Sequence, residues 1–273
     1  MGDADCVAFL QEALPRLGLR WQGFRKVHGQ VCKRLRRRMK ELEIEGFAAY
    51  RKQLDNYPEE WTVLDGLTHI TISRFFRDKA IFEALRTRVL PDIAARAERE
   101  ARNVQVWSAG CASGEEPYTI KILWDIEVAR AHPTVSIEIA ATDVDDAMLA
   151  RARNGCFKLT SLHELPRLLV EQAFEQVDQL YCLKSKHRQG VEFINQDLRS
   201  EIPARLFDLI LCRYVAFTYF ASAPQCKVLA RMLERLRPNG YLVTGADEKL
   251  PDIVPGIVSL DGERHIFQKI AGP

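Results

Sequence analysis

The sequence lacks any apolar run near the roughly 18 residues that a membrane-spanning helix requires. Its first stretch, MGDADCVAFLQEALPRLGLR, carries Asp3 and Asp5 and has no apolar core of the kind found in secretion signals. Internal repeats and low-complexity linkers are missing as well, which argues against solenoid and largely disordered classes. We therefore predict a cytoplasmic globular protein without a membrane span.

Cysteine pairs of the CxxC type are also absent, although the chain has seven cysteines. Structural zinc sites and small disulfide-bonded folds depend on closely spaced or evenly paired cysteines. We therefore predict reduced thiols, no metal site and no disulfide framework. The cysteines are scattered over the chain, at Cys6, Cys32, Cys111, Cys156, Cys182, Cys212 and Cys226.

The common nucleotide-binding fingerprints are absent from VQVWSAGCASGEEPY, residues 104–118, which predicts a strand, a loop of small residues and a helix start. Gly110 and Gly114 are spaced GxxxG, which matches neither the dinucleotide pattern GxGxxG nor the P-loop. Glu115 and Glu116 would also repel a pyrophosphate from the helix end. An adenosine ligand with a positive charge, such as S-adenosylmethionine (SAM), fits better, and a purely structural turn is the alternative.

Charge of one sign is not in excess, since 39 Lys and Arg side chains stand against 37 Asp and Glu side chains. Positive charge is concentrated in an N-terminal module that apolar spacings of three and four predict to be helical over residues 5–57. Its basic block is either a solvated helix face or a docking surface for an acidic partner. No aromatic residue interleaves the block, which disfavours nucleic acid. The block consists of Lys33, Arg34, Arg36, Arg37, Arg38 and Lys40.

The order of the remaining elements predicts an α/β fold, because β-branched apolar runs alternate with segments of helical apolar spacing. Such alternation, closed by a hairpin, indicates a Rossmann-like, doubly wound sheet with an antiparallel edge. In chain order we predict a connector over residues 61–77 with Ser73 as a helix cap, helices over 79–98 (bent near Pro91) and 116–131, a strand over 135–141, a helix over 147–153, two strands around a polar turn within 180–198, a strand over 207–213, a helix over 225–236, a strand over 241–245 and a hairpin over 257–270.

An acidic run, TDVDD at residues 142–146, follows the second predicted strand of the sheet. At this place in a Rossmann-like fold, a carboxylate accepts hydrogen bonds from two ribose hydroxyls. Asp143 is the first acid after the strand, and we therefore choose it for the ribose. Asp145 or Asp146 is expected to cap the following helix.

Four motifs together are more specific than any one of them. They are SRFFRD at residues 73–78, WSAGCASGEEPY at 107–118, ATDVD at 141–145 and FDLILCR at 207–213. With these motifs the chain resembles the CheR family of chemoreceptor glutamate methyltransferases over nearly its whole length. The resemblance implies a basic N-terminal helical domain over residues 1–75, a SAM-dependent methyltransferase domain over 76–273 and a small β-subdomain inserted at 157–196.

The resemblance also implies where SAM, and its product S-adenosylhomocysteine, would bind. Arg77 would bind the methionine carboxylate, Asp143 would hold the ribose, and Asp197 would lie near the adenine. Arg213 and Tyr219 would border the methyl-transfer site as catalytic residues. The full set of implied cofactor-binding residues is Thr71, Ser73, Arg77, Ala109, Gly110, Glu116, Asp143, Val144, Asp197, Leu198, Arg213 and Tyr214.

The chain departs from the family pattern on the acceptor side. Family members typically have Cys-Arg-Asn and Tyr-Phe-Asp, whereas this chain has Tyr214 after Arg213 and Ala221 after Phe220. We predict that the protein O-methylates carboxylates, namely those of glutamate side chains in an acidic protein partner. A carboxylate is nucleophilic at neutral pH, so the transfer needs placement and no general base. The alternatives are a small-molecule or nucleic-acid methyltransferase and a non-catalytic SAM-binding regulator.

Overall fold

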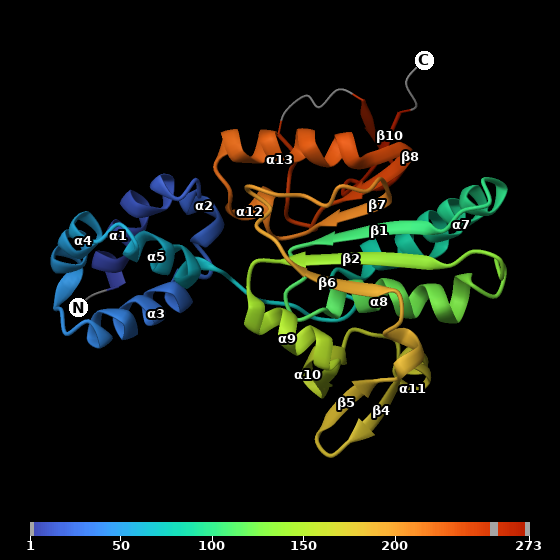
Figure 1. Cartoon of the computed structure of the whole chain (residues 1–273), viewed down its shortest axis with the longest axis horizontal. Coiled ribbons are helices and arrows are strands. Elements are labelled where there is room, and N and C mark those ends of the chain that lie inside the picture. The colour runs from blue at the N-terminus through green and yellow to red at the C-terminus, as the bar shows by residue number, and fades with distance from the viewer. Residues whose placement is uncertain (1–2, 252–255, 271–273) are drawn as a thin grey trace. The chain divides into compact units, whose positions relative to one another are not determined.

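The computed structural model describes residues 3–251 and 256–270, which form two compact units (Figure 1). The first unit holds the described residues up to Ile70 together with Thr218–Gln225. The second begins at Thr71 and holds the other described residues. The boundary predicted from the sequence, after residue 75, lies a few residues further along the chain. Every helix in the described part of the chain is too short or too polar to cross a membrane.

The first unit is helical, and its buried apolar residues follow the predicted spacing. Phe9, Leu14, Val31 and Leu35 are at most 1% exposed, so the helices pack on one another through these side chains. The last helix was not predicted, because Thr62 and Val63 suggested a connector; burial of apolar side chains overrides this weak local preference. The helices are α1 (Asp3–Arg16), α2 (Trp21–Phe24), α3 (His28–Glu41), α4 (Gly46–Asn56) and α5 (Glu60–Thr68).

A short segment from late in the chain completes the first unit. The backbone N–H of Arg20 donates to the carbonyl oxygen of Tyr219 at 2.8 Å, and the N–H of Ala221 donates to that of Gly18 at 2.8 Å. A side chain at Gly23 would bring its Cβ within 2.3 Å of the Thr218 carbonyl oxygen. Glycine at position 23 therefore allows the late segment to approach the helices closely.

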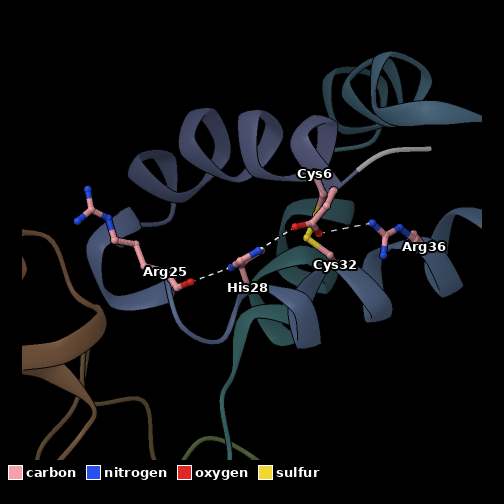
Figure 2. Close-up of a disulfide and its surroundings, with 6 residues drawn as sticks. Cys6, Arg25, His28, Cys32 and Arg36 are labelled. Atoms are coloured by element: carbon pink, nitrogen blue, oxygen red, sulfur yellow. Dashed lines mark hydrogen bonds and ion pairs between the residues drawn. A yellow bond between two sulfur atoms is a disulfide. The ribbon is translucent and has the colours of Figure 1, made fainter.

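Two disulfides correct the prediction of reduced thiols. Cys6 of α1 is bonded to Cys32 of α3 (Figure 2), and Cys156 is bonded to Cys182. Each pair is separated by 26 residues in sequence, so no short spacing motif announces it. Tertiary packing brings each pair together, which local spacing cannot reveal. The free cysteines are Cys111, Cys212 and Cys226.

The second unit is built on a seven-stranded sheet with the order β6-β2-β1-β7-β8-β10-β9. The strands from β6 to β8 are parallel, and β10 and β9 are antiparallel. The predicted Rossmann-like sheet with an antiparallel edge hairpin is therefore confirmed. The strands are β1 (Val104–Ala109), β2 (Ile137–Asp143), β6 (Val191–Asn195), β7 (Phe207–Cys212), β8 (Leu236–Val243), β9 (Ile257–Ser259) and β10 (Ile266–Lys269).

Every residue of β7 is buried, as expected for a parallel strand covered on both faces. Helices α8 and α9 pack against β2 and β6, and α7 packs against β1. The helices predicted over residues 79–98 and 116–131 each contain a π-helical turn. Pro91 follows the π-helical turn of the first helix and lies in the first turn of α7. The helical segments are α6 (Lys79–Ala84), η1 (Leu85–Val89), α7 (Leu90–Arg99), α8 (Glu115–Leu123), η2 (Trp124–Val128), α9 (Asp146–Asn154), α12 (Ala216–Tyr219) and α13 (Ser222–Arg235).

The predicted helix caps had mixed outcomes. Asp145 accepts hydrogen bonds from the N–H groups of Ala147 and Met148, so its capping role is confirmed. Ser73 caps no helix, because α6 begins only at Lys79. Asp78, the residue that precedes α6, has a left-handed backbone, and its side chain does not cap the helix. Its carboxylate is used elsewhere, as described below.

A second, three-stranded sheet with the order β3-β5-β4 forms the small β-subdomain. The strand that follows the polar turn, β6, pairs with β2 in the main sheet, so the two strands predicted within residues 180–198 belong to different sheets. Phe75 packs edge-on against Phe157 and Phe174, with ring centroids 4.8 and 5.3 Å apart. The elements are β3 (Cys156–Lys158), α10 (Leu159–Leu162), α11 (Arg167–Ala173), β4 (Phe174–Val177), β5 (Leu180–Leu183) and η3 (Ser185–His187).

Candidate active site

Three parallel strands of the second unit end at one edge of the sheet. Ala109, the last residue of β1, is in register with Thr142 of β2 and Cys212 of β7. The residues that follow, Gly110, Asp143 and Arg213, therefore lie at the same edge of the sheet. Ligands of open α/β folds bind at the carboxyl ends of such strands. The register thus brings together residues that the sequence places more than a hundred positions apart.

The glycine loop between β1 and α8 is fixed by backbone hydrogen bonds. The N–H groups of Gly110 and Cys111 donate to the carbonyl oxygen of Thr142 at 2.8 and 2.9 Å. Gly110 has φ +78°, and a Cβ there would lie 2.2 Å from a methyl carbon of Val215. A side chain at position 110 would therefore displace the loop that follows β7.

Two carboxylates occupy the first turn of α8. Glu115 is 2% exposed and accepts a hydrogen bond from the hydroxyl of Ser113. Glu116 accepts one from the hydroxyl of Ser108 at 2.7 Å. Because negative charge already occupies the positive end of the helix dipole, a phosphate is disfavoured there and a cation is favoured.

Asp143 ties the glycine loop to the segment after β2. Its carboxylate accepts hydrogen bonds from the N–H of Ala112 at 2.8 Å and the N–H of Asp145 at 3.0 Å. The next residue, Val144, is 38% exposed. Asp143 also pairs in register with Asn195 of β6, which brings the β6 end beside it. The side chain therefore lies at the sheet edge and at the same time orders the loop.

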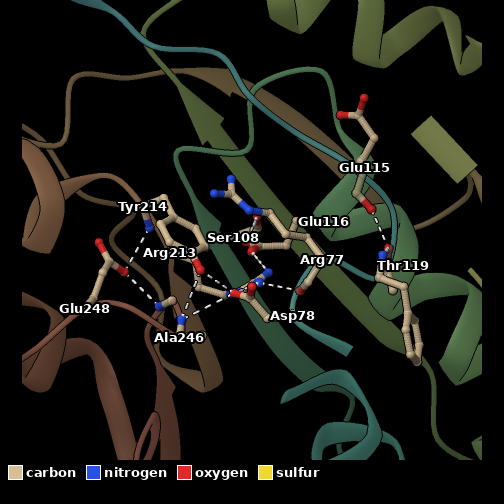
Figure 3. Close-up of polar contacts among 12 residues, drawn as sticks. Arg77, Asp78, Ser108, Glu115, Glu116, Thr119, Arg213, Tyr214, Ala246 and Glu248 are labelled. Atoms are coloured by element: carbon tan, nitrogen blue, oxygen red, sulfur yellow. Dashed lines mark hydrogen bonds and ion pairs between the residues drawn. The ribbon is translucent and has the colours of Figure 1, made fainter. Parts of the chain in front are cut away.

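Arg213 is a buried cation held by two carboxylates (Figure 3). Its side chain is 3% exposed, and its two terminal nitrogens lie 2.8 Å from oxygens of Asp78 and Glu116. It also donates to the carbonyl oxygen of Arg77 at 2.5 Å. Burial lowers the pKa of the guanidinium, but the two carboxylates outweigh burial and raise the pKa above its usual value. Arg213 therefore joins β7, α8 and the start of α6 as a permanent charge.

Asp78 is the centre of a second set of hydrogen bonds. It accepts from Arg213, from the hydroxyl of Tyr214 at 2.7 Å and from the N–H of Ala246 at 3.3 Å. Burial raises the pKa of the Asp78 carboxyl, but Tyr214 and Arg213 outweigh it and hold that pKa below its usual value. Burial, followed by the bond to Asp78, raises the pKa of the Tyr214 hydroxyl to about 12.

The segment that carries Arg77 is anchored by the two residues just before it. The N–H of Phe75 donates to Ser161 at 2.9 Å, and the N–H of Phe76 donates to the hydroxyl of Thr119 of α8 at 3.3 Å. The guanidinium carbon of Arg77 lies 3.6 Å from the centroid of the Tyr214 ring. Arg77 is thereby brought to the same cluster as Arg213, although the loop around it is otherwise irregular.

The other predicted site residues are placed as follows. Thr71 and Ser73 lie in the irregular segment before α6 and are partly buried. Asp197 forms an ion pair with Arg199 at 2.8 Å, and Leu198 is 7% exposed. Tyr219 belongs to the first unit, where its ring packs against Phe24 with centroids 5.0 Å apart. Their assigned roles stay predictions.

Two residues of the cluster had no predicted role. Asp78 ends the SRFFRD motif, and that position beside Arg77 was the available signal. Glu248 is 5% exposed and accepts hydrogen bonds from the N–H of Tyr214 at 2.9 Å and of Gly245 at 2.7 Å. No local pattern indicates this contact, since it joins the loops after two different strands.

The basic block of α3 is partly used within the first unit. Arg34 donates to the carbonyl oxygens of Leu67 and His69, and Arg38 forms an ion pair with the buried Glu60 at 2.7 Å. The hydrogen bond from Arg38 lowers the pKa of Glu60. Arg36 lies 3.8 Å from a carboxylate oxygen of α1. The exposed cations of the block are Lys33, Arg37 and Lys40, and Arg37 also lies 3.3 Å from a carboxylate oxygen of Glu41.

The chain matches the family described as CheR methyltransferase, SAM binding domain, over residues 71–261. A chemotaxis protein methyltransferase of Listeria monocytogenes is 33% identical over 184 residues, 67% of this chain and 67% of that protein. Chemotaxis protein methyltransferase 2 of Vibrio cholerae is 30% identical over 258 residues, 92% of this chain and 87% of that protein.

Two further similarities are limited, one by the share of the relative that is matched and the other by low sequence identity. An uncharacterized 104.1 kDa protein of Rhodobacter capsulatus is 31% identical over 242 residues, 89% of this chain, and the chain spans only 25% of that protein. The solved structure of the N-methyltransferase NodS from Bradyrhizobium japonicum has a TM-score of 0.40 at 14% identity, covering 71% of this chain and 99% of the other. The fold assignment follows from the strand order and does not depend on this likeness.

The fold and the family match together define a SAM-dependent methyltransferase. Within that class, the chain belongs to the CheR methyltransferase family. SAM is its methyl donor. Among the described residues, no group of three or more His, Cys, Asp or Glu side chains is arranged to hold a metal ion.

Proposed function

We propose that this protein transfers the methyl group of SAM to the carboxylates of glutamate side chains in an acidic protein partner that belongs to a chemotaxis system. Relatives named as chemotaxis protein methyltransferases support this assignment. The observation that carries it is the composition of the cluster around Arg213. Its described side chains are carboxylates, guanidinium groups and a tyrosine hydroxyl that are bonded to one another, with no imidazole or thiol among them.

Such a cluster suits an acceptor that needs no deprotonation. Two thiols are close in sequence to cluster residues, Cys111 before Glu116 and Cys212 directly before Arg213, and burial raises the pKa of both. Tyr214 and Arg213 hold the pKa of the Asp78 carboxyl below its usual value, which makes Asp78 a poor general base. A carboxylate acceptor is already anionic at neutral pH, so alignment with the methyl group is enough for transfer. Tyr219 orients that acceptor through its hydroxyl, and Arg213 fixes the surrounding loops.

The cofactor is held by the sheet edge. Asp143 accepts hydrogen bonds from the ribose while it orders the glycine loop, since a carboxylate has room for up to about four such bonds. Arg77 binds the methionine carboxylate as a fork of N–H donors. Glu116 and the backbone at Ala109 and Gly110 line the sulfonium side. Asp197, Leu198 and Val144 border the adenine, and Thr71 and Ser73 complete the Arg77 side.

The acidic partner docks on the exposed cations of α3, Lys33, Arg37 and Lys40. Opposite charge raises the association rate and weakens with added salt. Arg34 and Arg38 contribute mainly to the stability of the helical unit, because their guanidinium groups are bonded within it.

Methyl transfer from labelled SAM tests the proposal directly. Purified protein is incubated with methyl-labelled SAM and a lysate, with an Arg77→Ala variant as the matched control. We expect label in protein that is released by mild alkali, because methyl esters hydrolyse and methylated amines do not. Stable label in RNA or in a metabolite would instead indicate one of the alternative acceptors. SAM binding without any transfer would indicate a regulator.

A further inference from the structure

Tyr214 has a backbone conformation that its residue type rarely adopts. It follows β7 directly and has φ +58°. In the left-handed region the Cβ crowds the following carbonyl oxygen, and asparagine tolerates this better than tyrosine. A tyrosine persists there only where its surroundings hold it.

Three contacts hold Tyr214 in this conformation. Its N–H donates to Glu248 at 2.9 Å, and its hydroxyl donates to Asp78 at 2.7 Å. Its ring lies against Gly245, where a Cβ would come within 2.7 Å of ring carbons. Gly245 therefore leaves the space that the ring fills. These contacts come from the loop after β8 and from the start of α6, so Tyr214 is held by two separate segments.

The guanidinium group of Arg77 lies over the Tyr214 ring. Its central carbon lies 3.6 Å from the ring centroid, close enough for stacking and for a cation–π attraction (Figure 3). One terminal nitrogen of Arg77 also donates to the carbonyl oxygen of Ile72 at 2.8 Å. Within residues 3–251 and 256–270, the Ile72 carbonyl oxygen is the one acceptor that the five N–H donors of Arg77 contact, so the stacked guanidinium presents further donors to a ligand.

We propose that Tyr214 is a positioning residue that holds Arg77 in the orientation needed to bind the carboxylate of the cofactor's amino-acid part. The proposal rests on the role of Arg77 given under Proposed function. A long arginine side chain loses rotamer freedom when it binds a ligand, and a fixed ring beneath it removes part of that loss in advance. The effect of Tyr214 is therefore confined to ligands that carry this carboxylate.

Calorimetry with two ligands tests whether Tyr214 affects only ligands that carry the amino-acid carboxylate. S-adenosylhomocysteine carries the amino-acid carboxylate, and 5′-methylthioadenosine has the same adenosine and sulfur without it. The main variant is Tyr214→Asn, since asparagine keeps the left-handed backbone while removing the ring. We expect it to weaken S-adenosylhomocysteine binding about tenfold. Binding of 5′-methylthioadenosine should change less than about twofold. Tyr214→Phe keeps the ring and should stay within about threefold for both ligands.

A double-variant cycle with Arg77→Ala shows whether Tyr214 acts through Arg77. We expect the double variant to bind S-adenosylhomocysteine no more weakly than Arg77→Ala alone. Equal losses for both ligands, or additive losses in the cycle, would show that the ring only supports the loops and would overturn the proposal. If Arg77→Ala leaves S-adenosylhomocysteine affinity unchanged, the assigned role of Arg77 fails first, and the role of Tyr214 fails with it. Melting temperatures confirm that each variant is folded.

Discussion

One terminal nitrogen of Arg213 lies 2.8 Å from a carboxylate oxygen of Glu116, and the arginine side chain is only 3% exposed. The pair joins the end of β7 to the first turn of α8, so it fixes the two loops that border the sheet edge. A buried ion pair is costly to form and more costly to break, because the remaining partner keeps its charge without compensation. Arg213 is therefore as much a structural residue as a candidate catalytic one.

Replacing Arg213 with Met should destabilise the protein by about 3–5 kcal/mol, because Asp78 and Glu116 lose their shared cation. Urea unfolding followed by circular dichroism measures this change. The matched control is Arg167→Met, since Arg167 forms an ion pair with Glu171 at 2.7 Å with its side chain 91% exposed. The control should cost at most about 1 kcal/mol. Similar losses for both variants would contradict the structural role of Arg213.

Asp143→Ala should weaken binding of S-adenosylhomocysteine by about 1–3 kcal/mol, from lost hydrogen bonds to a charged acceptor. Isothermal calorimetry gives the affinity. Asp145→Ala serves as the control, because Asp145 caps α9 through Ala147 and Met148. That variant should lower stability by about 1 kcal/mol and leave the affinity unchanged. Asp143 would be removed from the site if its variant bound the ligand as tightly as the wild type.

The sequence predicted this site only as far as local pattern reaches. Asp143 was identified because it is the first acid after a predicted strand, whereas Arg213 was assigned through the resemblance of the FDLILCR motif to the CheR family. The contact between Arg213 and Asp78 joins residues 135 positions apart, so no periodicity could announce it. The left-handed backbone of Tyr214 was equally hidden, since the residue type argues against it. Side-chain pairing and backbone strain both depend on tertiary packing.

Thiol counting tests the two disulfides. Without reductant, the unfolded chain should titrate three thiols, Cys111, Cys212 and Cys226. After reduction it should titrate all seven cysteines. In the native protein Cys226 should react first, because it is exposed while the other two thiols are buried. Seven thiols before reduction would restore the prediction of reduced cysteines and contradict both bonds.

The pH dependence of the helical unit should include a contribution from His28. Its two ring nitrogens contact the Arg25 carbonyl oxygen and the Asp3 carboxylate, and both acceptors need a donor, so the protonated ring fits best. The hydrogen bond to Asp3, followed by that to Arg25, raises the pKa of His28 above 6.5. This stabilisation is fully present below about pH 6.5 and is lost as the pH rises through the folded-state pKa.

Proton NMR titration of the His28 ring measures that pKa. In the Asp3→Asn variant it should fall back toward 6.5, because the largest cause of the shift is removed. The difference in unfolding free energy between wild type and His28→Gln should shrink between about pH 5 and about pH 9. A His28 pKa at or below 6.5 in the wild type would contradict the predicted direction.

Reversing the exposed charges of α3 should depress turnover of an acidic protein acceptor while leaving SAM affinity intact. The variant combines Lys33→Glu, Arg37→Glu and Lys40→Glu, and it spares Arg38 because that side chain holds the buried Glu60. Charges beyond about 8 Å are screened at physiological salt, so the local field of these cations governs association. The loss should appear in kcat/KM and shrink as salt rises.

A control variant with the same change in net charge separates local from overall electrostatics. It combines Arg130→Glu, Lys186→Glu and Lys227→Glu, three exposed cations outside α3. We expect this control to keep most of the wild-type turnover at every salt concentration, because its charges lie outside the docking helix. Equal losses of turnover in the two triple variants would show that net charge, and not the position of the cations on α3, causes the effect. Equal turnover by the wild type and the α3 variant across the salt titration would reject docking on α3 and favour a small-molecule acceptor.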